Sequence, residues 1–309
     1  MNDTWTLDRS YESAEGTVRW AALGDPAAPP VVLLHGTPWS SYTWRGIARA
    51  LAADHRVYVW DMPGYGTSAR HEGQDVSLRA QGRLFAELLE HWQPAQPAVV
   101  AHDFGGAVAL RAHLLHGARY SRLALVDAVA SAPWGSDTYR LLGGHAEVFT
   151  RLPSFLHGAL VREYISSVGG PGLRADVLER LAEPWLDEAG QAAFYRQIAQ
   201  NDQRWTDEIE DRYSSLDLPV LVCWGTEDAW LPVGHARRLA ATIPGARLQL
   251  LAGAGHLVQE DAPAELTATL RRFLGEEPAA AVTGPAQAQA HAQAQAQAQA
   301  QTPVPAPAS

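Results

Sequence analysis

Short apolar runs alternate along the chain with longer stretches of helical pattern. Six runs of this kind cover residues 31–34, 57–60, 98–101, 123–126, 220–223 and 247–251. Continuous apolar runs of this length are typical of strands buried on both faces of a parallel sheet. Residues 77–92 and 106–116 follow a helical pattern, and residues 17–22 predict an early antiparallel strand. The alternation predicts a doubly wound α/β domain.

The alternation stops between residues 130 and 215. This stretch is rich in Trp, Tyr and Leu, and it predicts several helices interrupted by Gly and Pro. We therefore expect a helical cap (130–215) inserted between two parts of the core, 1–129 and 216–275. An insertion at this place lies above the carboxyl ends of the strands, where open α/β sheets bind ligands.

After residue 275 the composition changes to Ala, Gln and Pro, with an Ala-Gln repeat over residues 286–301. Side chains of this kind cannot build a hydrophobic core. We expect residues 276–309 to form a disordered tail.

Charge and composition narrow the function classes. The net charge of −10 over 309 residues disfavours nucleic acid or an anionic membrane as a partner. The single Cys223 fits a reducing compartment, and neither a signal sequence nor a membrane span is evident. We expect a cytoplasmic protein that acts on a small apolar molecule, and the sequence leaves its oligomeric state open.

The strongest chemical signal follows the apolar run at residues 98–101. The sequence continues as His102-Asp103-Phe104-Gly105-Gly106, so that a buried strand ends and small residues open a helix. This is the strand–turn–helix frame of the nucleophile elbow, in which the usual Ser is replaced by Asp103. The alternative is that Asp103 caps the following helix.

Further residues in matching positions favour the nucleophile. Thr37 follows the first apolar run, and its N–H and that of Phe104 would form an oxyanion hole. Asp228 follows the strand at 220–223, and His256 follows the last strand. The order nucleophile, acid, histidine is the order of the α/β-hydrolase triad, so we assign catalytic roles to Asp103, Asp228 and His256.

Four motifs carry a resemblance to the α/β-hydrolase superfamily, specifically to its haloalkane dehalogenase and epoxide hydrolase branch. They are residues 35–45 (HGTPWSSYTWR), 61–68 (DMPGYGTS), 102–106 (HDFGG) and 255–261 (GHLVQED). The similarity covers roughly residues 10–275. It implies an α/β-hydrolase fold, and the His-Asp pair at the elbow points to the branch with an Asp nucleophile.

A carboxylate nucleophile narrows the substrate class. It is weak towards esters but can displace a leaving group from sp3 carbon, which gives an alkyl ester of the enzyme. Water activated by His256 would then attack that ester, with Asp228 orienting the imidazole. The favoured substrates are therefore epoxides and alkyl halides.

The leaving-group apparatus of both subfamilies is incomplete. Dehalogenases typically place a Trp after the nucleophile and an Asn or Glu after the His-Gly pair, whereas this chain has Phe104 and Thr37 there. Substitute indole N–H donors are Trp39, Trp134, Trp185, Trp205 and Trp230. Epoxide hydrolases use a pair of cap tyrosines. The resemblance gives Tyr195 as one cap acid candidate, and Tyr139 and Tyr164 are candidates for the other by location.

The motifs leave open which acid orients His256 and which reaction the site performs. Asp127, after the strand at 123–126, is an alternative acid, although the loop of Asp228 matches the commoner arrangement. Hydrolysis of an ester or lactone, or a non-catalytic binding protein of the same fold, are rival functions. Neither a metal-ligand spacing nor a phosphate-binding glycine loop is evident, so no cofactor and no metal are implied.

Overall fold

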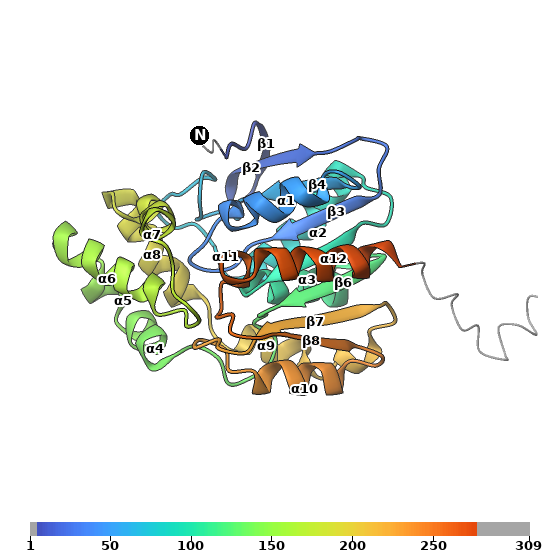
Figure 1. Ribbon diagram of the computed structural model, residues 1–309. Coiled ribbons are helices and arrows are strands. Elements are labelled where there is room, and N and C mark those ends of the chain that lie inside the picture. The colour runs from blue at the N-terminus through green and yellow to red at the C-terminus, as the bar shows by residue number, and fades with distance from the viewer. Residues whose placement is uncertain (1–4, 277–309) are drawn as a thin grey trace, which may run out of the picture. The chain divides into compact units, whose positions relative to one another are not determined.

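The computed structural model describes residues 5–276, and an eight-stranded sheet forms its centre (Figure 1). The strand order is β1-β2-β4-β3-β5-β6-β7-β8. The strands are β1 (Arg9–Ser13), β2 (Gly16–Leu23), β3 (Pro30–Leu34), β4 (Arg56–Trp60), β5 (Ala98–His102), β6 (Arg122–Val126), β7 (Val220–Gly225) and β8 (Arg247–Leu251). The pairs β1–β2 and β2–β4 are antiparallel, and the other neighbours are parallel. The fold is therefore the expected α/β-hydrolase type.

Both faces of the sheet are buried, which explains the continuous apolar runs. Along β3, Val31 and Leu33 pack in one hydrophobic cluster, whereas Val32 and Leu34 pack in another on the opposite face. Helices α1 (Arg45–Leu51) and α12 (Pro263–Gly275) contact one another on the first face (Figure 1). The opposite face packs against the helices α2 (Leu78–Trp92), α3 (Phe104–His116) and α10 (Gly234–Thr242).

The chain between β6 and β7 is helical. Its α-helices are α4 (Asp137–Gly144), α5 (Ala146–Phe149), α6 (Ser154–Ser166), α7 (Ala175–Ala182), α8 (Glu188–Gln200) and α9 (Arg204–Glu210). Most of this segment, which we call the cap, lies beyond the carboxyl ends of the parallel strands (Figure 1). The loops that carry functional residues leave the sheet at that same edge, so the cap covers them.

At its N-terminal end the structure adds one strand to those that the sequence predicts. Strand β1 was not expected, because its polar, half-exposed residues lack an apolar pattern; it forms by pairing with β2. The expected tail at 276–309 lies, apart from Glu276, outside the described residues.

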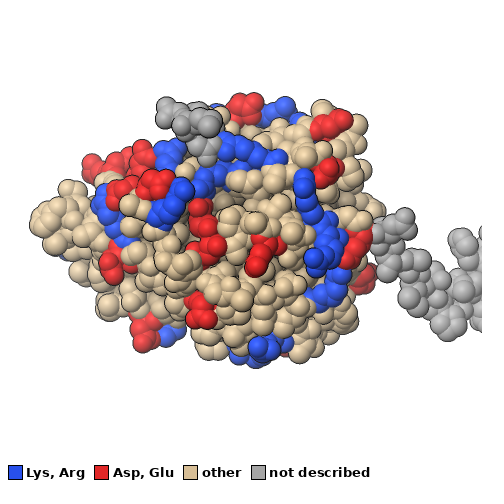
Figure 2. Space-filling view, viewed as in Figure 1, with Lys and Arg blue, Asp and Glu red and all other residues tan. Residues whose placement is uncertain are grey.

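The surface and the helix lengths bear on the expected partners. On the face seen in Figure 2, acidic and basic side chains are interspersed. Within residues 5–276, the search for a helix both long and apolar enough to cross a membrane finds none.

Candidate active site

Asp103 occupies a strained turn between β5 and α3. Its φ is 51° and its ψ is −121°, a conformation that a residue with a side chain rarely adopts. Close packing imposes the turn: a Cβ on Gly105 would lie 2.6 Å from the carbonyl oxygen of His35, and one on Gly106 would lie 2.5 Å from Cβ of Ala128. The side chain of Asp103 makes no capping hydrogen bond to α3. The turn therefore directs the carboxylate away from the helix, which contradicts the capping alternative.

The loop after β3 brings a backbone donor to this carboxylate. The N–H of Thr37 donates to Oδ1 of Asp103 at 2.7 Å. Gly36 permits the approach, because a Cβ there would lie 2.3 Å from the Asp103 side chain. Phe104, the other expected donor, is the first residue of α3, where an N–H has no intrahelical acceptor. Its contribution to an oxyanion hole stays a prediction.

His256 lies between two carboxylates. Its Nε2 is 3.3 Å from Oδ2 of Asp103, and its Nδ1 is 2.9 Å from Oδ2 of Asp228. The second oxygen of Asp228 accepts the N–H groups of Trp230 and Leu231, each at 2.8 Å. The structure thus brings together the three residues that the sequence places about 125 and 28 positions apart along the chain.

The same arrangement sets the protonation of the histidine. Burial alone would lower the pKa of His256, but the negative charges of Asp228 and Asp103 offset it and raise the pKa well above its ordinary value. For Asp228, burial opposes ionisation, and its contact with His256 lowers the pKa nevertheless. The two carboxylates therefore favour the protonated form of the imidazole between them.

Asp127, the alternative acid, lies behind Asp228 rather than against Nδ1 of His256. Its Oδ1 accepts the N–H of Gly225 at 2.9 Å. Among the described residues, Asp127, Asp228 and His256 form the one cluster whose spacing would suit a metal, with ligand atoms within 4.8 Å of one another. However, Asp228 and His256 already share a hydrogen bond, so this geometry serves the triad.

A small cavity adjoins the carboxylate of Asp103, with a volume of ≈ 30 Å³. Space of this size holds about two water molecules at ~10–15 Å³ each. Its lining residues, mostly apolar and aromatic, are Thr37, Asp103, Phe104, Val129, Trp134, Gly135, Ser136, Tyr139, Tyr164, Trp230 and Leu231. A larger hollow of ≈ 410 Å³ shares Ser136, Tyr164 and Trp230 with it and leads to the surface. The inner space beside Asp103 fits only a small group.

Two cap tyrosines line this cavity, and Tyr195 does not. The hydroxyl of Tyr139 donates to the carbonyl oxygens of Asn201 at 3.2 Å and Ile198 at 3.4 Å. The hydroxyl of Tyr164 has no hydrogen-bond partner among the described residues. Burial raises the pKa of Tyr164, and the charge of Asp103 raises it further, so its phenol keeps its proton at neutral pH.

The expectation for Tyr195 needs correction. Its hydroxyl lies 2.9 Å from Nδ1 of His157, and Nε2 of His157 bonds to the carbonyl oxygen of Trp185. Nε2 therefore carries the ring proton, and Tyr195 donates to Nδ1. This phenol is fully buried in the cap and commits its proton there.

Four of the five candidate tryptophans donate their indole N–H elsewhere. Their acceptors are Oγ1 of Thr206 for Trp134, the carbonyl of Pro38 for Trp185, the carbonyl of Gln200 for Trp205 and Oγ of Ser167 for Trp230. Trp39 is buried, and its N–H has no acceptor among the described residues. Its ring stacks on Trp230 with centroids 5.6 Å apart, and Trp230 in turn lies 5.1 Å from the His256 ring.

Gln197, which no sequence motif singled out, joins the cap to the oxyanion loop. Its Oε1 accepts from Oγ1 of Thr37 at 2.7 Å and from the hydroxyl of Tyr65 at 3.1 Å. On helix α8, Gln197 lies about 200° around the axis from Tyr195, so the two side chains face opposite sides. The position of each residue around the helix axis is the signal that distinguishes Gln197 from Tyr195, once it is known which side of α8 faces the core.

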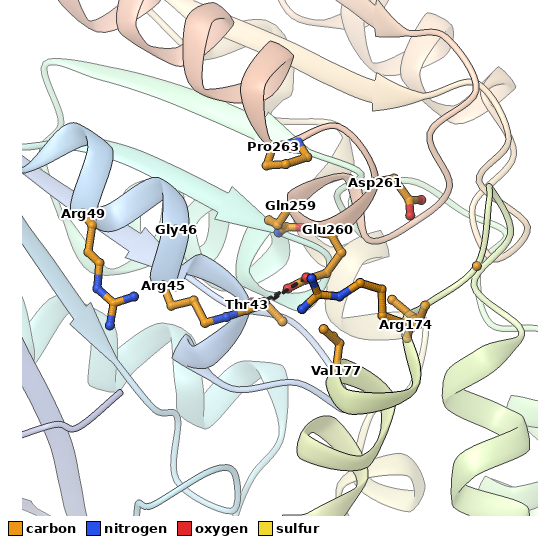
Figure 3. Close-up of a pocket in the computed structure, with 12 residues that line it drawn as sticks. Thr43, Arg45, Gly46, Arg49, Arg174, Val177, Gln259, Glu260, Asp261 and Pro263 are labelled. Carbon is orange, nitrogen blue, oxygen red and sulfur yellow. Dashed lines mark hydrogen bonds and ion pairs between the residues drawn. The ribbon is translucent and has the colours of Figure 1, made fainter. Parts of the chain in front are cut away.

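Residues of the motif at 255–261 hold the loop that carries His256 in place. Glu260 forms a two-pronged ion pair with Arg45, with contacts of 2.5 Å and 3.0 Å, at the edge of a separate ≈ 270 Å³ pocket (Figure 3). Asp261 accepts the N–H of Gly255, next to the histidine, at 2.8 Å. The cap contributes the carbonyl of Val168, which accepts the N–H of His256 at 3.0 Å. These contacts fix the backbone on both sides of the imidazole.

Known proteins resemble this chain in structure or in sequence. A structure from Burkholderia ambifaria, described as an alpha/beta hydrolase fold protein, is 46% identical, covers 86% of this chain and 97% of its own, and has a TM-score of 0.83. Epoxide hydrolase A of Mycobacterium tuberculosis is 29% identical over 83% of this chain and 94% of its own length. A pimeloyl-[acyl-carrier protein] methyl ester esterase of Aeromonas salmonicida is 28% identical over 80% and 96%.

The names of the two curated relatives differ in chemistry, since one is an epoxide hydrolase and the other a methyl ester esterase. The family profile described as the alpha/beta hydrolase fold matches residues 29–263. On that match, and on the sheet and triad described above, the chain belongs to the alpha/beta hydrolase family.

Proposed function

We propose that the protein hydrolyses small epoxides, with Asp103 as the nucleophile and Tyr164 as the acid. One observation carries the proposal: an uncommitted phenol and the nucleophilic carboxylate line the same small cavity. A carboxylate attacks sp3 carbon, and a neutral phenol protonates the oxygen that leaves. The aromatic lining favours an uncharged substrate.

Ring opening forms the alkyl-enzyme ester. Oδ1 of Asp103 is held by the N–H of Thr37, so Oδ2 is the oxygen that attacks the ring carbon. A C–O bond forms there as the ring C–O bond breaks. The ring oxygen takes the hydroxyl proton of Tyr164, which leaves a hydroxyalkyl ester of Asp103 and a tyrosinate.

Esterification then changes the role of His256. Asp103 loses its negative charge, which is one of the two charges that raise the pKa of His256. The imidazolium therefore gives up its proton more readily, and that proton balances the one that Tyr164 lost. Neutral His256 removes a proton from water, and the hydroxide attacks Cγ of Asp103. The oxyanion forms on Oδ1 beside the N–H of Thr37. Its collapse breaks the Cγ–Oδ2 bond, the departing alkoxide takes a proton from protonated His256 and becomes the diol, and the new carboxyl group of Asp103 returns its proton to His256.

A haloalkane is the second candidate substrate, and Trp39 is the observation that favours it. Its buried indole N–H has no acceptor among the described residues, and its ring stacks on Trp230, which lines the Asp103 cavity although Trp39 itself does not. Halide stabilisation needs N–H donors of this kind. Halide displacement uses the same attack by Asp103 and the same ester hydrolysis, but it does not require a phenol.

The test is a product screen with three substrate classes. Wild type, Asp103→Asn and Tyr164→Phe are each given styrene oxide, 1-bromobutane and a p-nitrophenyl ester. We expect diol from the epoxide, with loss in both variants. Halide release that survives in Tyr164→Phe identifies a dehalogenase. Ester hydrolysis that survives in Asp103→Asn contradicts the Asp nucleophile.

A further inference from the structure

Asp127 and Asp228 are two buried carboxyl groups at the ends of neighbouring parallel strands. Asp127 directly follows β6, and Asp228 lies in the loop after β7. Asp127 is 0% exposed and Asp228 is 6% exposed. Two adjacent buried carboxylates repel one another strongly, so a stable arrangement requires a compensating proton or cation.

The hydrogen bonds of the two carboxyl groups show which oxygen lacks a donor. Asp228 accepts three N–H groups, from Trp230, Leu231 and His256. Asp127 accepts one, from Gly225 on Oδ1. Its Oδ2 is buried and has no N–H or O–H donor among the described residues.

A carboxylate oxygen of Asp127 lies within 4.8 Å of one of Asp228, so the two buried groups face each other at close range. Neither carboxylate has a donor when both are ionised, so a hydrogen bond between them forms only when one of them carries a proton. A proton on Oδ2 of Asp127 turns the unpartnered atom into a donor. It also gives Asp228 its fourth hydrogen bond, which fills the capacity of a carboxylate.

We propose that Asp127 is held as a neutral carboxylic acid, whose Oδ2–H donates to Asp228 and fixes that carboxylate against His256. The proton belongs on Asp127 because its partner accepts three N–H groups, one of them from the imidazole, and these stabilise the ionised form. Asp127 lines no part of the Asp103 cavity, so it acts as a positioning residue.

The surroundings of Asp127 agree with this assignment. Burial raises its pKa well above the ordinary value, the charge of Asp228 raises it further, and His256 opposes this. The other titratable group facing it is the thiol of Cys223 on β7, whose pKa is also raised by burial and then by Asp127. Folding above about pH 3.9, the ordinary pKa of an aspartate, therefore requires Asp127 to take up a proton.

The decisive experiment compares the stability of wild type and Asp127→Asn by urea unfolding from about pH 5 to about pH 8. The amide keeps both contacts without a proton, since its oxygen accepts from Gly225 and its nitrogen donates to Asp228. In wild type, the folded state binds one more proton than the unfolded state, so stability falls as pH rises. The folding constant of Asp127→Asn relative to wild type should therefore rise by up to about tenfold per pH unit.

The control is Asp25→Asn, which replaces an exposed turn carboxylate and should give a ratio that does not change with pH. A flat or falling ratio for Asp127→Asn overturns the proposal. The same rise in Asp228→Asn instead of Asp127→Asn would place the proton on Asp228 and would also overturn it. If Asp127→Asn does not fold, infrared spectroscopy of wild type decides: a carboxylic acid C=O band at neutral pH supports the neutral acid, and its complete absence overturns it.

The positioning role rests on the proposed function, whereas the proton uptake does not. Asp127→Leu removes the donor to Asp228, and we expect it to lower kcat for epoxide hydrolysis about 10- to 100-fold with little change in KM, as loss of a partner that orients a catalytic group does. Asp127→Asn should recover most of that loss. Failure of wild type to turn over any epoxide would remove the proposed function and leave the stability result intact.

Discussion

The core half of the candidate site and its cap half are built by different means. In the core, each reactive group stands at the end of a strand, and backbone N–H groups hold Asp103, Asp127 and Asp228. In the cap, side chains on helices reach the site, and helical phase and packing decide which of them do. Tyr164 lines the cavity, whereas Tyr195 bonds to His157.

Because of this difference, the core positions the nucleophile and the cap positions the residue that acts on the leaving group. A strand end fixes a side chain to a narrow range of positions, because the sheet determines where the backbone leaves it. A residue on a cap helix changes its direction by 100° with each step along the sequence. The chemistry of the nucleophile is therefore set by the core, and the chemistry of the leaving group is set by the cap.

The largest expected effect tests the core. Asp103→Asn removes the nucleophile and leaves an amide of the same shape, so epoxide hydrolysis should fall by at least about 10³-fold, as loss of a nucleophile does elsewhere. Steady-state diol formation measures it, and circular dichroism checks that the fold is intact. Activity within tenfold of wild type would mean that Asp103 does not attack the substrate.

The next effect divides the reaction into its two halves. His256→Gln should still form the ester, because Oδ2 of Asp103 attacks without a base, but it should not hydrolyse it. We expect about one equivalent of epoxide to be consumed per enzyme without release of diol, and intact-protein mass spectrometry should detect an adduct of the substrate's mass. Steady turnover without a trapped adduct would contradict an ester intermediate.

The sequence predicted the core half well and the cap half poorly, for the same physical reason. Buried parallel strands have apolar runs that locate their own ends, so Asp103, Asp228 and His256 could be placed from local patterns. Asp127 was also found this way, although as a rival to Asp228 rather than as its neighbour. Strand β1 has no apolar pattern and became visible only through its pairing with β2.

The cap offers no comparable local signal. The motif around Tyr195 matches an epoxide hydrolase pattern, yet the structure turns its hydroxyl to His157, a partner 38 positions away. Gln197, two residues later, instead meets Thr37 across 160 positions. Contacts over such separations depend on how the helices pack, and single positions do not encode them.

Tyr164→Phe is the third prediction, and it tests whether the cap supplies the acid while the core supplies the nucleophile. The variant keeps the ring that packs against Trp230, with centroids 4.8 Å apart, and loses only the acid. We expect epoxide hydrolysis to fall by about 10²-fold, within the usual contribution of a general acid. Halide release from an alkyl bromide, if wild type has it, should be unchanged. A uniform loss on every substrate would indicate a structural role for Tyr164.

Tyr195→Phe should have the smallest effect on activity and a clear effect on stability. Loss of the hydroxyl leaves Nδ1 of His157 buried without a donor, which costs about 1–3 kcal/mol of unfolding free energy. The hydroxyl does not reach the cavity, so kcat and KM for the epoxide should stay within about twofold, less than about 0.5 kcal/mol of transition-state stabilisation. Thermal unfolding and steady-state kinetics on the same preparation measure both.

The pair of tyrosine variants decides where the acid lies. Each variant removes one phenolic hydroxyl, from α6 in Tyr164→Phe and from α8 in Tyr195→Phe, so the two differ in position and not in chemistry. If Tyr195→Phe abolishes diol formation while Tyr164→Phe does not, the cap must rearrange during turnover to bring the Tyr195 phenol over Asp103. That movement would have to break the bond to His157 and enlarge the ≈ 30 Å³ cavity. If Tyr164→Phe alone loses activity, the packing of the cap in this structure is the arrangement that opens the ring.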